Sequence, residues 1–223
     1  MCYDSLTQHR RTTLLGTITL ATIIARLIVF FVAFPAHEGA HAVVADRLGD
    51  PTPRAAGRIT LNPIKHLDVL GAFLFILVGI GWAQTPISPY YLGRRGMAIV
   101  SLAGPVANLL VAALFAIPTH LVLNSPQLAG LFGLGVVFPS LGRVLADMIS
   151  LNVLLFVFNL IPLPPLDGYR IVLGLLPYTL AQSFQRIERY GSLILFGLIL
   201  IAPGVIGAII RPVASLVMGL LGF

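Results

Sequence analysis

Several apolar stretches of the chain are long enough to cross a lipid bilayer. A membrane-spanning helix needs about 20 mostly apolar residues in succession. Three stretches meet that length, at residues 97–123, 150–176 and 190–210. A longer apolar run, 13–45, is interrupted by Arg26 and Pro35. It would reach roughly 50 Å as one helix, so we expect it to tilt steeply, to kink at Pro35 or to form two pieces.

The balance of apolar and charged residues excludes an ordinary soluble domain. Hydrophobic residues make up 57% of the chain and charged residues 10%, whereas a globular domain carries about 25% charged residues. The basic residues gather beside the apolar stretches, in 8–11, 47–65, 94–95 and 186–189, which is typical of cytoplasmic loops. Nucleic-acid binding is excluded, because no polar surface supports a basic face.

The number of membrane crossings is less definite than their existence. Residues 69–83 are apolar but short, which indicates a thin span or a re-entrant segment, and 128–148 contain glycines, Pro139 and charges. The tail, 213–223, is too short to cross alone. We therefore expect an all-α integral membrane protein, a polytopic bundle of about four to six transmembrane segments. Residues 1–223 are expected to form a single transmembrane domain.

One stretch outside the apolar runs has the pattern of a strand. Residues 58–63, with sequence RITLNP, alternate in polarity after a turn at 49–53. We expect a short membrane-associated β strand or hairpin there. Its unpaired edge would allow an extended peptide to pair with it.

The first apolar run contains two histidines and a glutamate in the pattern HEGAH, at His37–His41. In a helix, residues i and i+4 share a face, so His37 and His41 can bind one cation. Glu38 then lies beside the metal and can take a proton from a water on it. Charged groups inside a membrane are costly and usually functional. The alternative is that three polar side chains line a packed or watery interior.

A catalytic zinc site needs a third protein ligand and an open position. The best candidate is Asp167, within 159–168 (NLIPLPPLDG), where prolines interrupt the helix and Gly168 permits a close approach. His37 precedes Arg47 by ten residues and Asp167 precedes Pro177 by ten. If both ends face the cytoplasm, both side chains lie about 15 Å inside the boundary. Asp167 could instead cap or brace the broken helix.

Other polar residues are weaker ligand candidates. Asp147 pairs naturally with Arg143 at spacing i, i+4. The remaining candidates are His66, Asp68 and His120. The single cysteine, Cys2, excludes a multi-cysteine metal site.

Two buried asparagines leave two interpretations open. Asn108 and Asn159 could hydrogen-bond between helices, or they could contact the substrate and donate to a developing oxyanion. Structural bonding is favoured for each.

With these motifs in order, the sequence resembles the site-2 protease family of intramembrane zinc metallopeptidases, peptidase family M50. Four ordered blocks carry the resemblance: 37–41 (HEGAH), 57–63 (GRITLNP), 103–108 (AGPVAN) and 159–168 (NLIPLPPLDG). It covers most of residues 29–176 and matches the compact branch, without a PDZ or a CBS domain.

The resemblance implies one Zn²⁺ held by His37, His41 and Asp167, with Glu38 as the catalytic acid and base. It implies cleavage within or near the transmembrane segment of a membrane-protein substrate, such as an anti-sigma factor or a membrane-tethered regulator. The expected location is the cell membrane, with a multi-pass chain and an active site nearer the cytoplasmic face. A metal-ion transporter or sensor is the alternative, since polar residues in spans also mark ion pathways.

Overall fold

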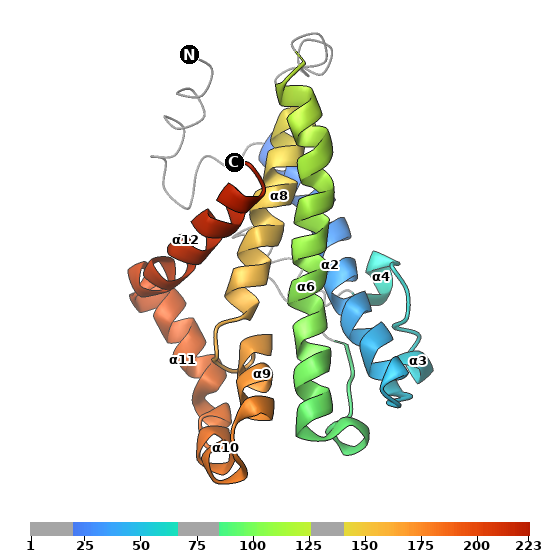
Figure 1. Ribbon diagram of the computed structural model, residues 1–223, viewed down its shortest axis with the longest axis vertical. Coiled ribbons are helices and arrows are strands. Elements are labelled where there is room, and N and C mark those ends of the chain that lie inside the picture. Colours follow the sequence, from blue (N-terminus) through green and yellow to red (C-terminus); the bar gives the residue numbers. More distant parts are fainter. Residues whose placement is uncertain (1–19, 67–84, 126–140) are drawn as a thin grey trace.

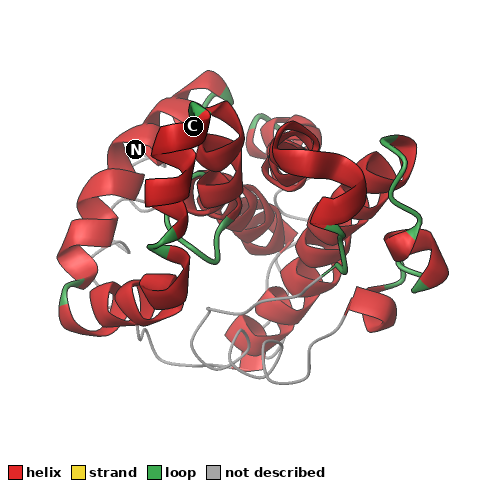
Figure 2. Cartoon of the chain, turned by 90° about the horizontal axis from the view of Figure 1, so that it is seen from below, coloured by secondary structure: helices red, strands yellow, loops and turns green. Residues whose placement is uncertain are grey.

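The structure, a computed structural model, describes residues 20–66, 85–125 and 141–223. Within these ranges the secondary structure is helical, and no strand occurs (Figure 2). The long helices are α2 (Leu20–Arg47), α6 (Pro89–Leu123), α8 (Leu141–Asn159), α11 (Glu188–Ile201) and α12 (Pro203–Leu220). The short ones are α3 (Thr52–Ala55), α4 (Pro63–His66), α9 (Asp167–Leu175) and α10 (Tyr178–Gln185).

Helices α2, α6 and α8 lie alongside one another and form the centre of the molecule (Figure 1). Val29 and Ala33 of α2 pack against Met148 of α8, and all three are almost fully buried. Ala112 of α6 belongs to a second buried cluster, with Ile149 and Val153 of α8. Small side chains at such contacts let helix backbones approach closely. Helix α9 packs against α6 beside this centre.

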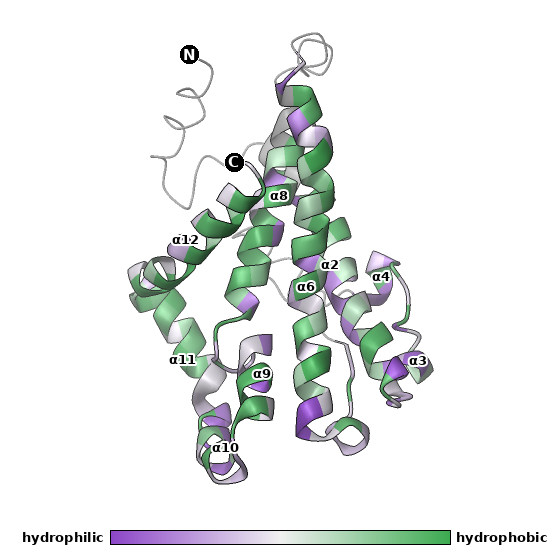
Figure 3. Ribbon diagram, viewed as in Figure 1, coloured by the Kyte–Doolittle hydropathy of each residue, from purple (hydrophilic) through white to green (hydrophobic). Residues whose placement is uncertain are grey.

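The outer face of α6 is covered with large apolar side chains. They recur every three or four residues and are 39–65% exposed: Ile99, Leu102, Val106, Leu110, Leu114, Ile117 and Leu121. Figure 3 shows apolar residues along much of α6, α8 and α12, and polar residues at α3, at α10 and at the start of α6. An apolar face this continuous is unusual on a water-soluble monomer. It suits a chain surrounded by lipid.

Three of the described helices contain stretches long and apolar enough to cross a membrane: 26–47, 89–122 and 203–220. Helix α8 contributes a shorter apolar stretch at 144–159. The expected all-α membrane protein is therefore confirmed for the described residues. The count of four to six crossings stays a prediction, because 69–83 and much of 128–148 lie outside them.

The structure excludes one of the alternatives for the first apolar run, two separate pieces, over residues 20–47. Helix α2 is continuous from Leu20 to Arg47 and contains Pro35 inside it. The predicted break in the 150–176 segment is also present. Helix α8 ends at Asn159, and α9 begins at Asp167, after an irregular stretch that holds the three prolines.

The prediction of one span at 190–210 is wrong. This segment contains the end of α11 and the start of α12, which are separated at Ala202. Ala202 has φ −133° and ψ 54°, outside the helical region. The reason is Pro203, because the ring of a proline disfavours the helical conformation of the residue before it. Helix α12 then continues to Leu220 and so includes most of residues 213–223, which alone are too short to cross.

The expected strand at 58–63 is not confirmed. This stretch is irregular up to Pro63, which begins α4. Its hydrogen bonds are local: the Thr60 N–H donates to the Arg58 carbonyl, and the Asn62 N–H donates to the Thr60 hydroxyl. A strand requires a paired neighbour, which the alternation of residues in sequence does not specify. No such neighbour lies within the described residues.

A buried carboxylate ties the end of α2 to the start of α6. Asp50 is fully buried. Its Oδ2 accepts the Ser88 N–H at 2.7 Å, and its Oδ1 accepts the N–H and hydroxyl of Thr52. Burial opposes ionisation, but these hydrogen bonds hold the pKa of Asp50 below its ordinary value. The carboxylate therefore stabilises the fold at neutral pH, and this stability is lost as the pH falls below 3.8 through the lowered pKa.

We predict that Asp50→Asn lowers the free energy of unfolding in detergent by about 1–3 kcal/mol at neutral pH, because the amide leaves a buried donor without an acceptor. Asp46→Asn is the matched control, because Asp46 pairs with Arg54, whose side chain is 72% exposed. Exposed ion pairs contribute little. Chemical denaturation of the two variants measures the difference, and equal losses would contradict a special role for Asp50.

Candidate metal centre

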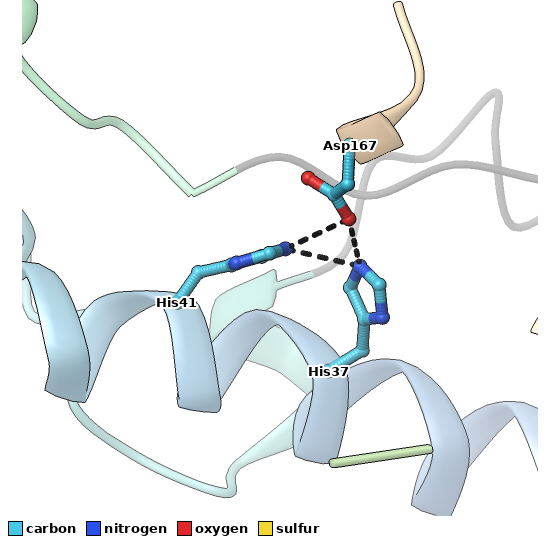
Figure 4. Close-up of side chains that lie close together, drawn as sticks. All are labelled: His37, His41 and Asp167. Carbon is cyan, nitrogen blue, oxygen red and sulfur yellow. Dashed lines mark hydrogen bonds and ion pairs between the residues drawn. The ribbon is translucent and has the colours of Figure 1, made fainter. Parts of the chain in front are cut away.

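Helix α2 places its two histidines on one buried face. His37 and His41 are 8% and 5% exposed, and Glu38 between them is 6% exposed. One helical turn separates the two imidazoles, so both point toward the same space (Figure 4). The carbonyl of Glu38 accepts the hydroxyl of Thr85 at 3.1 Å. The glutamate thus stands next to the first histidine, inside the protein.

The broken helix brings the third side chain into this space. Asp167 is the first residue of α9, and its side chain is 12% exposed. The next residue, Gly168, packs tightly against the end of α8, since a Cβ there would lie 2.3 Å from the Leu160 carbonyl oxygen. Only glycine permits this approach. The carboxylate of Asp167 therefore faces the two imidazoles of α2 (Figure 4).

Three ligand atoms meet at one point. The Oδ2 of Asp167 lies 3.1 Å from His37 Nε2 and 3.3 Å from His41 Nε2, and the two Nε2 atoms are 3.0 Å apart. Zinc ligands at about 2.0–2.2 Å in tetrahedral directions are separated by roughly 3.3–3.5 Å. The observed triangle is only slightly smaller. Among the described residues, these three form a group of side chains that could hold one metal ion.

The outer ring nitrogens show which atoms are free to bind a cation. His37 Nδ1 lies 2.6 Å from Asn108 Oδ1, and His41 Nδ1 lies 2.7 Å from the Val100 carbonyl oxygen. Both partners are acceptors, so each Nδ1 carries a hydrogen and each neutral ring keeps its lone pair on Nε2. Two such lone pairs and a carboxylate in a buried space repel one another. This donor set fits a divalent cation, and two imidazoles with a carboxylate suit zinc.

Helix α6 closes one side of the centre through a glycine. A Cβ at Gly104 would lie 2.4 Å from His41 Nε2 and 2.6 Å from His37 Nε2. It would therefore occupy the space between the ligand atoms. In the sequence, Gly104 is one residue of the AGPVAN block at 103–108, and no local pattern gives it a role. Only the meeting of α2 and α6 reveals the reason for glycine.

The other candidate residues are engaged elsewhere. Asn159 Nδ2 donates to the Leu155 carbonyl in its own helix. His66 Nε2 lies 2.7 Å from the Thr60 carbonyl, and His120 Nε2 lies 2.8 Å from the Leu221 carbonyl. Asp68 and the side chain of Arg143 lie outside the described residues.

Asn108 is the exception among the secondary candidates. It is fully buried and contacts His37 directly. Its Nδ2 donates to Ala33 O and to Asn152 Oδ1, so both amide hydrogens have acceptors. This favours hydrogen bonding between helices over donation to an oxyanion. Asn152 was not among the predicted residues, because a single asparagine in an apolar run carries no pattern.

Comparisons with known proteins find relatives that are named as zinc metalloproteases. The model of peptidase family M50 matches residues 127–202. The chain is 40% identical over 171 residues to a Bacillus subtilis protein named "Putative zinc metalloprotease YwhC", with 75% of this chain and 76% of the relative covered. It is 31% identical over 178 residues to "Putative zinc metalloprotease Rip2" of Mycolicibacterium smegmatis, covering 74% of this chain and 62% of that protein. No solved structure matches.

We predict that Gly104→Ala abolishes zinc binding, because the added methyl group competes with the ion for the space between the two Nε2 atoms. Gly197→Ala is the matched control, because a Cβ at that helical glycine meets nothing within 4 Å. Zinc per protein molecule, measured by elemental analysis of purified protein, should fall only for Gly104→Ala. If Gly104→Ala still bound one zinc ion per protein molecule, the ion would not lie between these atoms.

Proposed function

We propose that this chain, which belongs to peptidase family M50, hydrolyses peptide bonds within or near the transmembrane segments of other membrane proteins. Membership rests on the Bacillus subtilis relative, which is 40% identical and of which the chain covers 76%. The chain is accordingly a zinc metalloprotease of the membrane. The proposal adds the residues that perform the reaction, the kind of segment that is cut and the side on which cutting occurs.

One observation carries the proposal: three metal-binding atoms converge beside a buried glutamate. The ligand atoms lie within 3.3 Å of one another, on helices α2 and α9. We assign His37, His41 and Asp167 as the ligands of one Zn²⁺. Three protein ligands leave a coordination position open, as in catalytic rather than structural zinc sites.

Bound Zn²⁺ supplies Lewis acidity, which polarises a carbonyl oxygen and acidifies water. Glu38 is assigned as the general base and acid. It accepts a proton from the attacking water and passes it to the nitrogen of the leaving amine. It follows His37 in α2 and is only 6% exposed, so its carboxylate is kept out of bulk solvent. Asn108 and the Val100 carbonyl hold the two imidazoles in orientation.

The substrate has to present an extended peptide to this centre. In an intact helix each carbonyl accepts a hydrogen bond from the residue four positions ahead, so it is closed to attack. The scissile part of a transmembrane segment must therefore unwind locally. Substrates such as an anti-sigma factor or a membrane-tethered regulator remain part of the proposal.

The transporter alternative is not favoured. A transporter would place polar groups along a route across the membrane, often in two related halves. Here the described ligand atoms meet at a single point, and the relatives are named as metalloproteases. Zinc flux into liposomes without proteolysis would support the transporter instead.

We place the active site nearer the cytoplasmic face of a multi-pass chain. Helix α2 ends at Arg47, and α6 carries Arg94 and Arg95 near its start. Arg94 Nη1 donates to the Leu176 carbonyl at 3.2 Å, so the end of α9 lies at the same end of the bundle (Figure 1). Basic residues gathered at one end favour the cytoplasmic side.

We predict that Glu38→Gln keeps zinc at wild-type stoichiometry and slows cleavage of a single-span membrane substrate by about 10²–10⁴-fold, because the amide cannot accept the proton. Glu188→Gln is the matched control, since Glu188 lies on α11 and accepts the Tyr169 hydroxyl. Cleavage in proteoliposomes and elemental analysis provide the two measurements. Cleavage by Glu38→Gln at the normal rate with zinc bound would refute this assignment.

We predict that the two ends of α6 lie on opposite sides of the membrane. With Cys2→Ser as the background, a cysteine at Asn124 should react with an impermeant maleimide in intact cells. One at Tyr90, which is 89% exposed, should react only after the membrane is opened. The reverse pattern would put the active site nearer the outer face. Labelling of both in intact cells would show that α6 does not cross.

A further inference from the structure

A chain of buried polar side chains leads from the metal centre into α8. His37 of α2 donates from Nδ1 to Asn108 Oδ1 at 2.6 Å. Asn108 of α6 donates from Nδ2 to Asn152 Oδ1 at 2.9 Å, and Asn152 of α8 donates from Nδ2 to the Met148 carbonyl at 2.7 Å. Both asparagines are 0% exposed. Three helices are thus joined by bonds that all run in one direction.

The fixed backbone carbonyls decide which way each amide is turned. Met148 O can only accept, so Nδ2 of Asn152 must face it and Oδ1 must face Asn108. Asn108 then has two acceptors on one side, Asn152 Oδ1 at 2.9 Å and Ala33 O at 3.3 Å. Its NH₂ group turns toward them, and its oxygen is left facing His37.

The orientation of Asn108 determines where the proton of His37 resides. Facing an amide oxygen, Nδ1 must be the protonated nitrogen, and Nε2 keeps the lone pair that points at the centre. If the amide turned over, its NH₂ would face Nδ1, which would then have to accept. The proton would move to Nε2, the atom 3.1 Å from Asp167, and block that atom as a ligand. Without Asn152, only the longer hydrogen bond from Asn108 to Ala33 O would still oppose this rotation of the Asn108 amide.

We propose that Asn152 is a positioning residue of the metal centre: it fixes the amide of Asn108 and thereby keeps Nε2 of His37 free to bind the metal. Asn152 contacts neither the ligands nor, on this assignment, the substrate. It acts through Asn108. The inference rests on the proposed metal site, and it concerns the affinity of that site rather than the reaction itself.

The test compares replacements of Asn152 by their zinc affinity, measured by competition with a chromogenic chelator on the purified full chain in detergent. Asn152→Leu and the smaller Asn152→Ala remove the acceptor and should weaken zinc binding by about 10–100-fold, as loss of an outer partner of a metal ligand does. Asn152→Asp should stay within about threefold of wild type. Its buried carboxyl takes the neutral form, accepts from Asn108 and donates to Met148 O.

Val153→Ala separates this role from a loss of packing. Val153 is the next residue of α8 and is 1% exposed, but it packs in the cluster with Ala112 and Ile149. The Val153→Ala variant should have a lower unfolding temperature and an unchanged zinc affinity. Equal loss of affinity in Val153→Ala and Asn152→Ala would overturn the proposal. So would wild-type affinity in Asn152→Ala.

The proposed function fails in a different way, because a wild-type protein that binds no zinc would refute the metal site whatever Asn152 does.

Discussion

Two imidazole lone pairs and a carboxylate face one another within 3.3 Å in the interior of the bundle. Groups of this kind repel unless a cation lies between them, and burial removes the water that would otherwise screen them. Much of the surrounding structure holds this arrangement. Helix α2 has to be regular from His37 to His41 to present both imidazoles on one face, and the chain has to break after Asn159 so that Asp167 can reach them.

Close approach of backbones is the second condition. Without a side chain at Gly104, α6 can lie against both Nε2 atoms, and without one at Gly168 the start of α9 can lie against Leu160. Each glycine gives up side-chain packing at its own position. What it allows is a geometry in which ligands from helices far apart in the sequence meet at one ion. The buried amides of Asn108 and Asn152 serve the same geometry, because they fix the hydrogen on His37 without adding a charge to the interior.

The elements that surround the centre are stabilised by other interactions. The apolar residues on the outside of α6 are exposed among the described residues, as is typical of a helix face that meets lipid. The fully buried Asp50 lies just after the end of α2. Its carboxylate accepts the backbone N–H groups of Thr52 and of Ser88, the residue before α6, and both would otherwise lack this partner. The buried side chains of Asp50, Asn108 and Asn152 thus have defined partners, and several of these partners are backbone groups.

Local sequence features were enough to predict a helical membrane protein and the three side chains that converge. Apolar length, the i, i+4 spacing of His37 and His41 and the prolines before Asp167 are local properties, and each depends only on backbone geometry within one segment. The break at Ala202 was not predicted from the sequence, even though Pro203 follows it. The reason is that a proline can also lie inside a helix, as Pro35 does. The prediction of a strand at 58–63 was not confirmed, because a strand forms only beside a second strand with which it can pair. Helix packing is needed to explain why residue 104 is glycine, why Asn108 bonds to His37 and why Asn152 is involved. The two hydrogen bonds join residues 44 and 71 positions apart, and only the packing of α2, α6 and α8 fixes which residues meet.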